Sequence, residues 1–149
     1  MSPLNTILSF TSVQQLLHSV FDAMTPTPPI VVVDEQYSTV EPDTVLASIT
    51  ADPILASSSF RQNVFDCDDY VLYLRTKVAL FASRTGLPAP LAVGYLITAE
   101  HAFNFCIDPA QRITLIDTQS NTVPSTNDPA EFTSFLNLTP GNTLALVYI

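Results

Sequence analysis

The strongest constraint on the fold is a change in the hydrophobic period near Gly86. Over residues 67–84, apolar side chains recur every three or four positions, which predicts a largely buried helix. Asp66 precedes this segment as a good N-cap, and Gly86 follows it as a C-terminal stop. From residue 91 onward the apolar positions alternate with a period of two, as is typical of β-strands. A helix followed by several strands predicts an α+β fold.

The remaining patterns place further elements around this central helix. In chain order, we expect a helix at 11–24, a strand at 30–33, helical turns at 43–49 and 52–56, the helix at 67–84, strands at 91–98, 101–107 and 113–117, a helix at 129–136 and a strand at 144–149. The three strands after the central helix should form an antiparallel meander. Prolines and weak periodicity between residues 34 and 63 predict a long loop that carries the helical turns. The length of 149 residues suits one domain spanning residues 1–149.

The charge balance excludes several classes of partner. The net charge is −9 and the chain has only five Lys and Arg residues, which are scattered. Nucleic acids and anionic membrane surfaces are therefore not expected as partners. No apolar run reaches the roughly 20 residues that span a bilayer, and no secretory signal is evident, so a cytoplasmic location is favoured. Cys67 and Cys106 are then expected to be free thiols.

Three residues have the chemistry of a thiol nucleophile site. Cys67 stands at the start of the central helix, and a helix N-terminus lowers the pKa of a thiol. In the hairpin that follows, pairing Ile107 with Gln111 sets apolar residues against each other and His101 against Asp117. If the central helix covers that face of the sheet, Cys67 comes close to His101. Cys67 would be the nucleophile, His101 the general acid and base, and Asp117 the group that orients His101.

Each of these residues also has a purely structural interpretation. A lone cysteine is most often a small buried apolar residue, and a lone histidine on an apolar face is usually a hydrogen-bonded core residue. Cys106 alternates to the face opposite His101 and is expected to be structural.

The aspartates around Cys67 raise a further question about this thiol. Asp66, Asp68 and Asp69 carry negative charge, which raises the pKa of a neighbouring thiol. A bound divalent cation such as Ca²⁺ would reverse that effect, and its ligands could come from Asp68, Asp69, Asp117 and Gln119. The alternative is that the aspartates only cap the helix.

An oxyanion hole would need donors near the start of the same helix. The backbone N–H of Cys67 can supply one donor, and the side-chain amide of Gln62 or Asn63 is the candidate for the other. Either amide could equally belong to an ordinary loop residue.

Residues 60–120 resemble a known family. Phe65-Asp66-Cys67-Asp68-Asp69-Tyr70, His101-Ala102-Phe103-Asn104-Phe105 and Leu115-Ile116-Asp117-Thr118-Gln119 are similar to motifs of the papain-like protease domain at the C-terminal end of certain mushroom agglutinins, and of related stand-alone bacterial and phage domains. The resemblance implies calcium-dependent proteolysis and dimerisation. Asp117 stands where the family typically has glutamate, one methylene longer. The agglutinins also carry a separate sugar-binding β-trefoil, for which this chain has no room, so the resemblance does not imply a lectin function.

The sequence thus predicts a papain-like α+β fold in which a central helix packs on a small antiparallel sheet. The predicted function is a cysteine peptidase with the triad Cys67, His101 and Asp117, a protein or peptide substrate, Ca²⁺ as a cofactor and a homodimeric state. Two alternatives stay open. One is transglutaminase or amidase chemistry with the same triad, and the other is a non-catalytic binding or structural module of the same fold.

Overall fold

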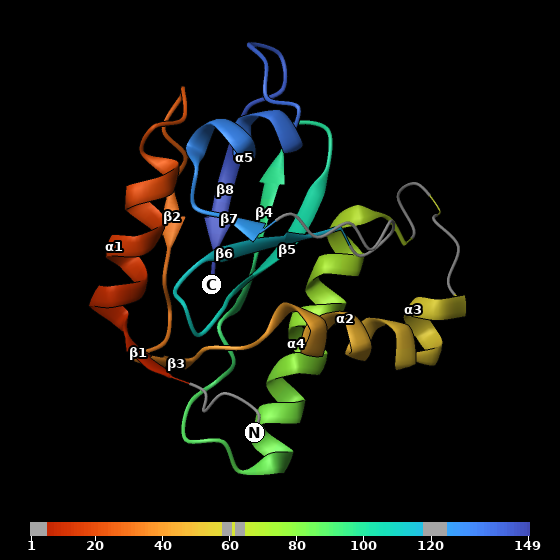
Figure 1. Cartoon of the computed structure of the whole chain (residues 1–149). Helices are drawn as coiled ribbons and strands as arrows, with labels where there is room; N and C mark the ends of the chain where they lie inside the picture. The colour runs from red at the N-terminus through yellow and green to blue at the C-terminus, as the bar shows by residue number, and fades with distance from the viewer. Residues whose placement is uncertain (1–5, 58–60, 62–64, 118–124) are drawn as a thin grey trace.

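The computed structural model describes residues 6–57, 61, 65–117 and 125–149. It consists of a six-stranded mixed sheet with helices on both faces and a small two-stranded sheet beside it (Figure 1). The elements are β1 (Ile7–Ser9), α1 (Phe10–Phe21), β2 (Ile30–Val31), β3 (Gln36–Ser38), α2 (Pro42–Ala51), α3 (Pro53–Ser57), α4 (Cys67–Thr85), β4 (Val93–Thr98), β5 (Ala102–Ile107), β6 (Ile113–Ile116), β7 (Ser125–Thr126), α5 (Pro129–Phe135) and β8 (Leu144–Tyr148). The α+β class predicted from the sequence is confirmed.

The main sheet has the strand order β2-β8-β4-β5-β6-β7. Strands β4, β5 and β6 form the predicted antiparallel meander, and β8 joins the outer side of β4, also antiparallel. The pairing of β2 with β8 is parallel, with Ile30 opposite Val147, so the sheet is mixed and not purely antiparallel as expected. The short strands β1 and β3 pair separately, antiparallel to each other.

The two faces of the sheet form two hydrophobic cores. On one face, Phe103 and Phe105 of β5 pack with α1 and α5. On the other face, Cys106 of β5 and Ile116 of β6 pack with α4 and α2. All six residues of β5 are buried because helices cover both of its sides. The meander is therefore the central layer of the molecule.

The central helix α4 matches its prediction closely. It begins at Cys67 after the N-cap Asp66, and the Asp66 N–H donates to the Asp69 carboxylate at 3.2 Å in a capping box. It ends at Gly86, which adopts the left-handed conformation with φ 67°. Local signals at both ends were sufficient to place this helix.

The segment predicted as a long loop is more regular than expected, because it contains β3, α2 and α3. Val45 and Ile49 of α2 are buried against the core that α4 completes. At the start of α3, the Asp52 carboxylate accepts the N–H groups of Ile54 and Leu55 at 2.9 and 3.1 Å. Such short helices owe their stability to packing rather than to propensity, which is why the sequence pattern showed them only weakly.

Candidate functional site

The structure brings His101 and Asp117 together at one end of the β5–β6 hairpin. The His101 Nε2 atom lies 3.5 Å from an Asp117 carboxylate oxygen, and both side chains are partly exposed. The His101 ring also meets the Phe103 ring edge-on, with 4.5 Å between centroids. These contacts hold the imidazole against the core formed with α1 and α5.

The strand register that joins this pair differs from the predicted one. Ile107 pairs with Ile113 and not with Gln111, so the register is displaced by two residues. Gln111 has a left-handed φ of 58° and belongs to the turn, which the Asp108 side chain closes by accepting the N–H of Arg112 at 2.8 Å. A displacement of two residues keeps every side chain on its face. In this register Asp117 falls opposite Phe103, and His101 is its diagonal neighbour on the same face.

The helix that carries Cys67 does not cover the face that was predicted. α4 packs on the side of Cys106, and the Asn104 side-chain amide donates to the Val71 carbonyl of α4 at 3.0 Å. His101 and Phe103 contact the opposite core. The sequence could not show this, because β5 is apolar on both faces and the pattern does not assign the helix to either one. Within the part of the chain that is described, no hydrogen bond joins Cys67 to His101.

The remaining predicted residues fall into two groups. The oxyanion candidates Gln62 and Asn63 and the metal candidate Gln119 lie outside the described residues.

Cys106 is fully buried, and burial raises the pKa of its thiol to about 12, with the charges of Asp108 and Glu41 adding to the effect. A thiol with this pKa stays protonated at neutral pH, in line with the structural role expected for Cys106.

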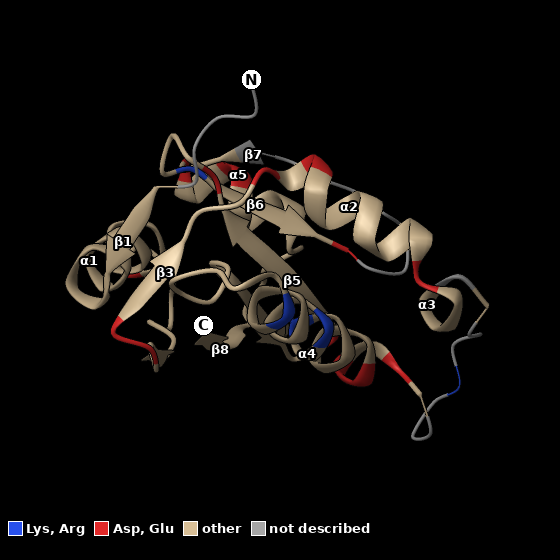
Figure 2. Ribbon diagram, turned by 90° about the horizontal axis from the view of Figure 1, so that it is seen from below, with Lys and Arg blue, Asp and Glu red and all other residues tan. Residues whose placement is uncertain are grey.

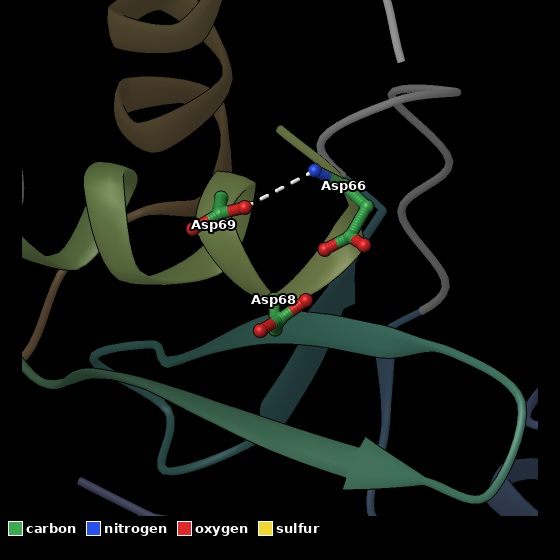
Figure 3. Close-up of side chains that lie close together, drawn as sticks. All are labelled: Asp66, Asp68 and Asp69. Atoms are coloured by element: carbon green, nitrogen blue, oxygen red, sulfur yellow. Dashed lines mark hydrogen bonds between the residues drawn. The ribbon is translucent and has the colours of Figure 1, made fainter. Parts of the chain in front are cut away.

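Three aspartates gather around the first turn of α4 (Figure 3). Carboxylate oxygens of Asp66, Asp68 and Asp69 lie within 4.8 Å of one another. A hydrogen bond from the protonated Asp68 carboxyl to Asp66 raises the pKa of Asp68, and partial burial and the two neighbouring charges add to it. Such crowding of like charges fits a divalent cation, since oxygen ligands suit Ca²⁺. The capping box explains the positions of Asp66 and Asp69 equally well, so calcium binding stays a prediction.

A different constellation, which the sequence did not indicate, lies further along α4. The Arg75 guanidinium carbon is 5.1 Å from the centroid of the Tyr148 ring. Tyr148 in turn stacks on Tyr95, with 5.0 Å between centroids and an interplanar angle of 21°. The Arg75 Nε atom is buried, and it has no hydrogen-bond partner among the described residues. Arg75 and Tyr148 are far apart in the sequence, and no local motif links them.

Arg75 and Tyr148 line a pocket of about 360 Å³. Its polar lining also includes Asp34 and Tyr37, and its apolar walls include Leu91. The Tyr37 hydroxyl accepts the N–H groups of Val33 and Asp34 and donates to the Ile149 carbonyl at 3.0 Å. Burial is the main cause that raises the pKa of Tyr37. The Tyr37 side chain is therefore neutral and fixed, and the pocket is largely formed in advance.

No helix among the described residues is long and apolar enough to cross a membrane.

Comparisons with known proteins give structural matches alone. No protein-family model matches the chain, and no curated protein matches its sequence. A chain of a structure described as a PSL1a–E64 complex superposes with a TM-score of 0.72 at 17% identity, over 96% of this chain and 50% of that one. The lectin of Polyporus squamosus, bound to the epitope Neu5Acα2-6Galβ1-4GlcNAc, superposes with a TM-score of 0.69 at 16% identity, over 96% and 49%. This chain therefore shares the fold of a mushroom lectin and spans about half its length.

These comparisons contradict the prediction of a cysteine peptidase. The second neighbour is described as a lectin bound to a glycan, and that description names no hydrolase or thiol protease. A protein or peptide substrate is likewise not supported.

Proposed function

We propose that this chain is a non-catalytic binding module that recognises an acidic sugar in the pocket between Arg75 and Tyr148. The observation that carries the proposal is the state of the Arg75 guanidinium. It stacks on the Tyr148 ring, and its buried Nε–H lacks a hydrogen-bond partner in the described structure. A buried donor without a partner costs about 1–3 kcal/mol, and a ligand carboxylate that displaces the groups covering Nε and accepts this hydrogen bond would recover that cost.

The charge pattern of the chain supports an anionic ligand at this position. Only five side chains are basic, against a net charge of −9, and three of the five lie on α4 (Figure 2). Lys77 and Arg112 are neutralised by Asp52 and Asp108 at 2.9 and 2.8 Å. Arg75 forms no ion pair with any residue in the described ranges. A guanidinium presents a planar set of donors that matches a carboxylate in two parallel hydrogen bonds.

The other pocket residues suit a sugar ring beside that carboxylate. The Tyr148 ring, stacked between Arg75 and Tyr95, holds the Arg75 guanidinium at the pocket. The Asp34 carboxylate can accept hydrogen bonds from sugar hydroxyl groups. The trisaccharide bound by the Polyporus squamosus lectin contains such an acidic sugar, Neu5Ac. Because this chain spans about half of that lectin, the trisaccharide serves here as the first probe of a site on this domain.

Isothermal titration calorimetry with matched arginine variants tests the proposal. We expect the wild type to bind Neu5Acα2-6Galβ1-4GlcNAc and Arg75→Gln to bind it at least about tenfold more weakly, which corresponds to about 1.4 kcal/mol. Arg61→Gln removes the same charge from an exposed side chain outside the pocket and should bind like the wild type. Equal affinities of the wild type and Arg75→Gln, or no binding by the wild type, would refute the proposal.

A further inference from the structure

A second cavity lies on the α2 and α3 side of the central helix. Its volume is about 300 Å³, at the lower end of the range of about 300–1,000 Å³ that is typical of small-molecule sites. Its walls are mostly buried apolar side chains from several elements, among them Val40, Val45, Leu55, Leu74 and Leu91. An apolar chain would therefore be enclosed by residues that already belong to the core.

One polar group inside this cavity is already fully engaged. The buried Asp52 carboxylate binds Lys77 Nζ at 2.9 Å, accepts two backbone N–H groups of α3, and accepts the Tyr73 hydroxyl at 3.3 Å. Burial by itself would raise the pKa of Asp52, but the hydrogen bond from Lys77 and the N–H groups of Leu55 and Ile54 hold it below its usual value. Asp52 is thus ionised, and it fixes Lys77 at the cavity wall.

Arg84 is the basic group at the cavity that remains available. It lines the cavity near the end of α4 and forms no ion pair within the described residues. Beside it, Leu80 and Phe81 line the same cavity while 46% and 51% exposed, although both are large apolar side chains. One apolar cavity thus holds two of the five basic side chains of a strongly acidic chain. This charge complementarity favours a ligand with one anionic group and one apolar tail.

We propose that this cavity binds a monomeric alkyl carboxylate of medium chain length. The alkyl chain would lie among the buried walls formed by Val45, Leu74 and Leu91, and the carboxylate would pair with the Arg84 guanidinium at the mouth. The exposed Leu80 and Phe81 would then cover the part of the chain nearest the head group. The site is distinct from the Arg75 pocket, from which it is separated by Val78 and Leu91, residues that line both.

Titration with decanoate below its micelle concentration tests this inference. We expect one decanoate per chain, an affinity that falls about fourfold for each methylene removed, and binding of the uncharged 1-decanol at least tenfold weaker. In Arg84→Gln the preference for decanoate over 1-decanol should disappear. Arg61→Gln removes the same charge elsewhere and should keep the preference.

A second variant separates occupation of the cavity from surface adsorption. Ser48 is an exposed residue at the cavity, and Ser48→Phe should block the alkyl chain without changing a buried side chain. Decanoate binding is expected to fall at least tenfold in Ser48→Phe, while the circular dichroism spectrum stays that of the wild type. Equal affinity for decanoate and 1-decanol in the wild type, unchanged binding in Arg84→Gln, or several decanoates per chain would each overturn the inference. Since sugar binding at Arg75 is measured separately, either proposal can fail without the other.

Discussion

Arg75 of the central helix stacks on Tyr148 of the last strand, with 5.1 Å between the guanidinium carbon and the ring centroid. The contact joins α4 to β8, and Tyr148 is held in turn by its stack on Tyr95. It places the basic group of one element on an aromatic surface supplied by another, at a preformed pocket. The binding function proposed for this chain rests on that arrangement.

Replacement of Tyr148 should separate the role of its ring from that of its hydroxyl. Tyr148→Leu removes the cation–π contact and the stack on Tyr95, and we expect affinity for the acidic trisaccharide to fall about fivefold, or about 1 kcal/mol. Tyr148→Phe keeps the ring and should bind within about twofold of the wild type. Calorimetric titration of both variants measures the difference. If the two variants bind equally, the ring does not form part of the site.

Gly94 should tolerate no side chain. A Cβ atom at Gly94 would lie 2.3 Å from the Tyr148 carbonyl oxygen and 2.5 Å from Cζ of Phe105. Gly94→Ala must therefore displace backbone or a buried ring, and we expect a loss of about 1–3 kcal/mol in the free energy of unfolding. Gly141→Ala is the matched control, because its nearest neighbouring atom is 4.0 Å away. Urea denaturation of both proteins provides the comparison. Similar denaturation midpoints for Gly94→Ala and Gly141→Ala would show that the structure around Gly94 can make room for a methyl group.

Asn104 ties the central helix to the sheet and should not accept a negative charge. Its buried amide donates to the carbonyls of Val71 and Gly94 at 3.0 and 3.1 Å. Asn104→Asp replaces these donors with acceptors, so we expect a loss of about 3–5 kcal/mol at pH 7. The loss should diminish as the pH falls, because burial favours the protonated acid. Denaturation at pH 7 and pH 4.5, each compared with the wild type, measures it, and a loss independent of pH would argue against a buried charge.

The cluster of aspartates at α4 should make stability depend on pH in a particular direction. The pKa of Asp68 is raised in the folded protein, chiefly through Asp66, so the folded state holds a proton that the unfolded state releases. This group therefore favours folding fully below its unfolded pKa near 3.8, and the contribution is lost as the pH rises through the raised folded value. Asp68→Asn should be more stable than the wild type at pH 7, with the gain shrinking toward pH 3.5. Asp43→Asn removes a charge from another helix start and should show no such gain.

The same variant tests the expected calcium site. If Ca²⁺ binds the three carboxylates, millimolar CaCl₂ should raise the melting temperature of the wild type but not that of Asp68→Asn. If calcium or magnesium raises the melting temperature of Asp68→Asn as much as that of the wild type, the cation binds somewhere other than these three carboxylates.

The correction from peptidase to binding module makes its own prediction. Neither the wild type nor Cys67→Ala should release fragments from a denatured protein substrate, because α4, which begins with Cys67, packs on one face of the sheet while His101 contacts Phe103 of the opposite core. Both should bind the acidic trisaccharide equally. Mass spectrometry of the substrate after incubation is the measurement, and cleavage by the wild type that is lost in Cys67→Ala would reverse the correction.

The sequence predicted the ends of the central helix and the three strands of the meander, because helix caps and strand alternation depend on residues close together in the chain. Asp66 and Gly86 fixed the ends of α4, and alternation fixed the meander, because caps and pleats act over a few residues. The register of the hairpin was wrong by two residues, since the Asp108–Arg112 contacts made its turn longer than the Asp-Pro pattern suggested. The placement of α4 on the sheet was also wrong, because β5 is buried on both faces.

The candidate binding site could not be predicted from the sequence for a related reason. Arg75 and Tyr148 meet only through the packing of α4 on the sheet, and nothing in the residues around either one indicates the other. The motif that did stand out, around Cys67, describes the start of a helix as well as it describes a nucleophile. Its aspartates form a capping box in the structure.

The nitrogen-15 NMR signal of the Arg75 Nε–H group, assigned by its absence in Arg75→Gln, is the most direct test of the proposed function. Addition of Neu5Acα2-6Galβ1-4GlcNAc should shift and sharpen this signal, because the carboxylate accepts the hydrogen bond that the buried Nε–H lacks. Galβ1-4GlcNAc, which has no carboxylate, should leave the signal in place. An unchanged Arg75 signal at a saturating concentration of the acidic trisaccharide would contradict the account.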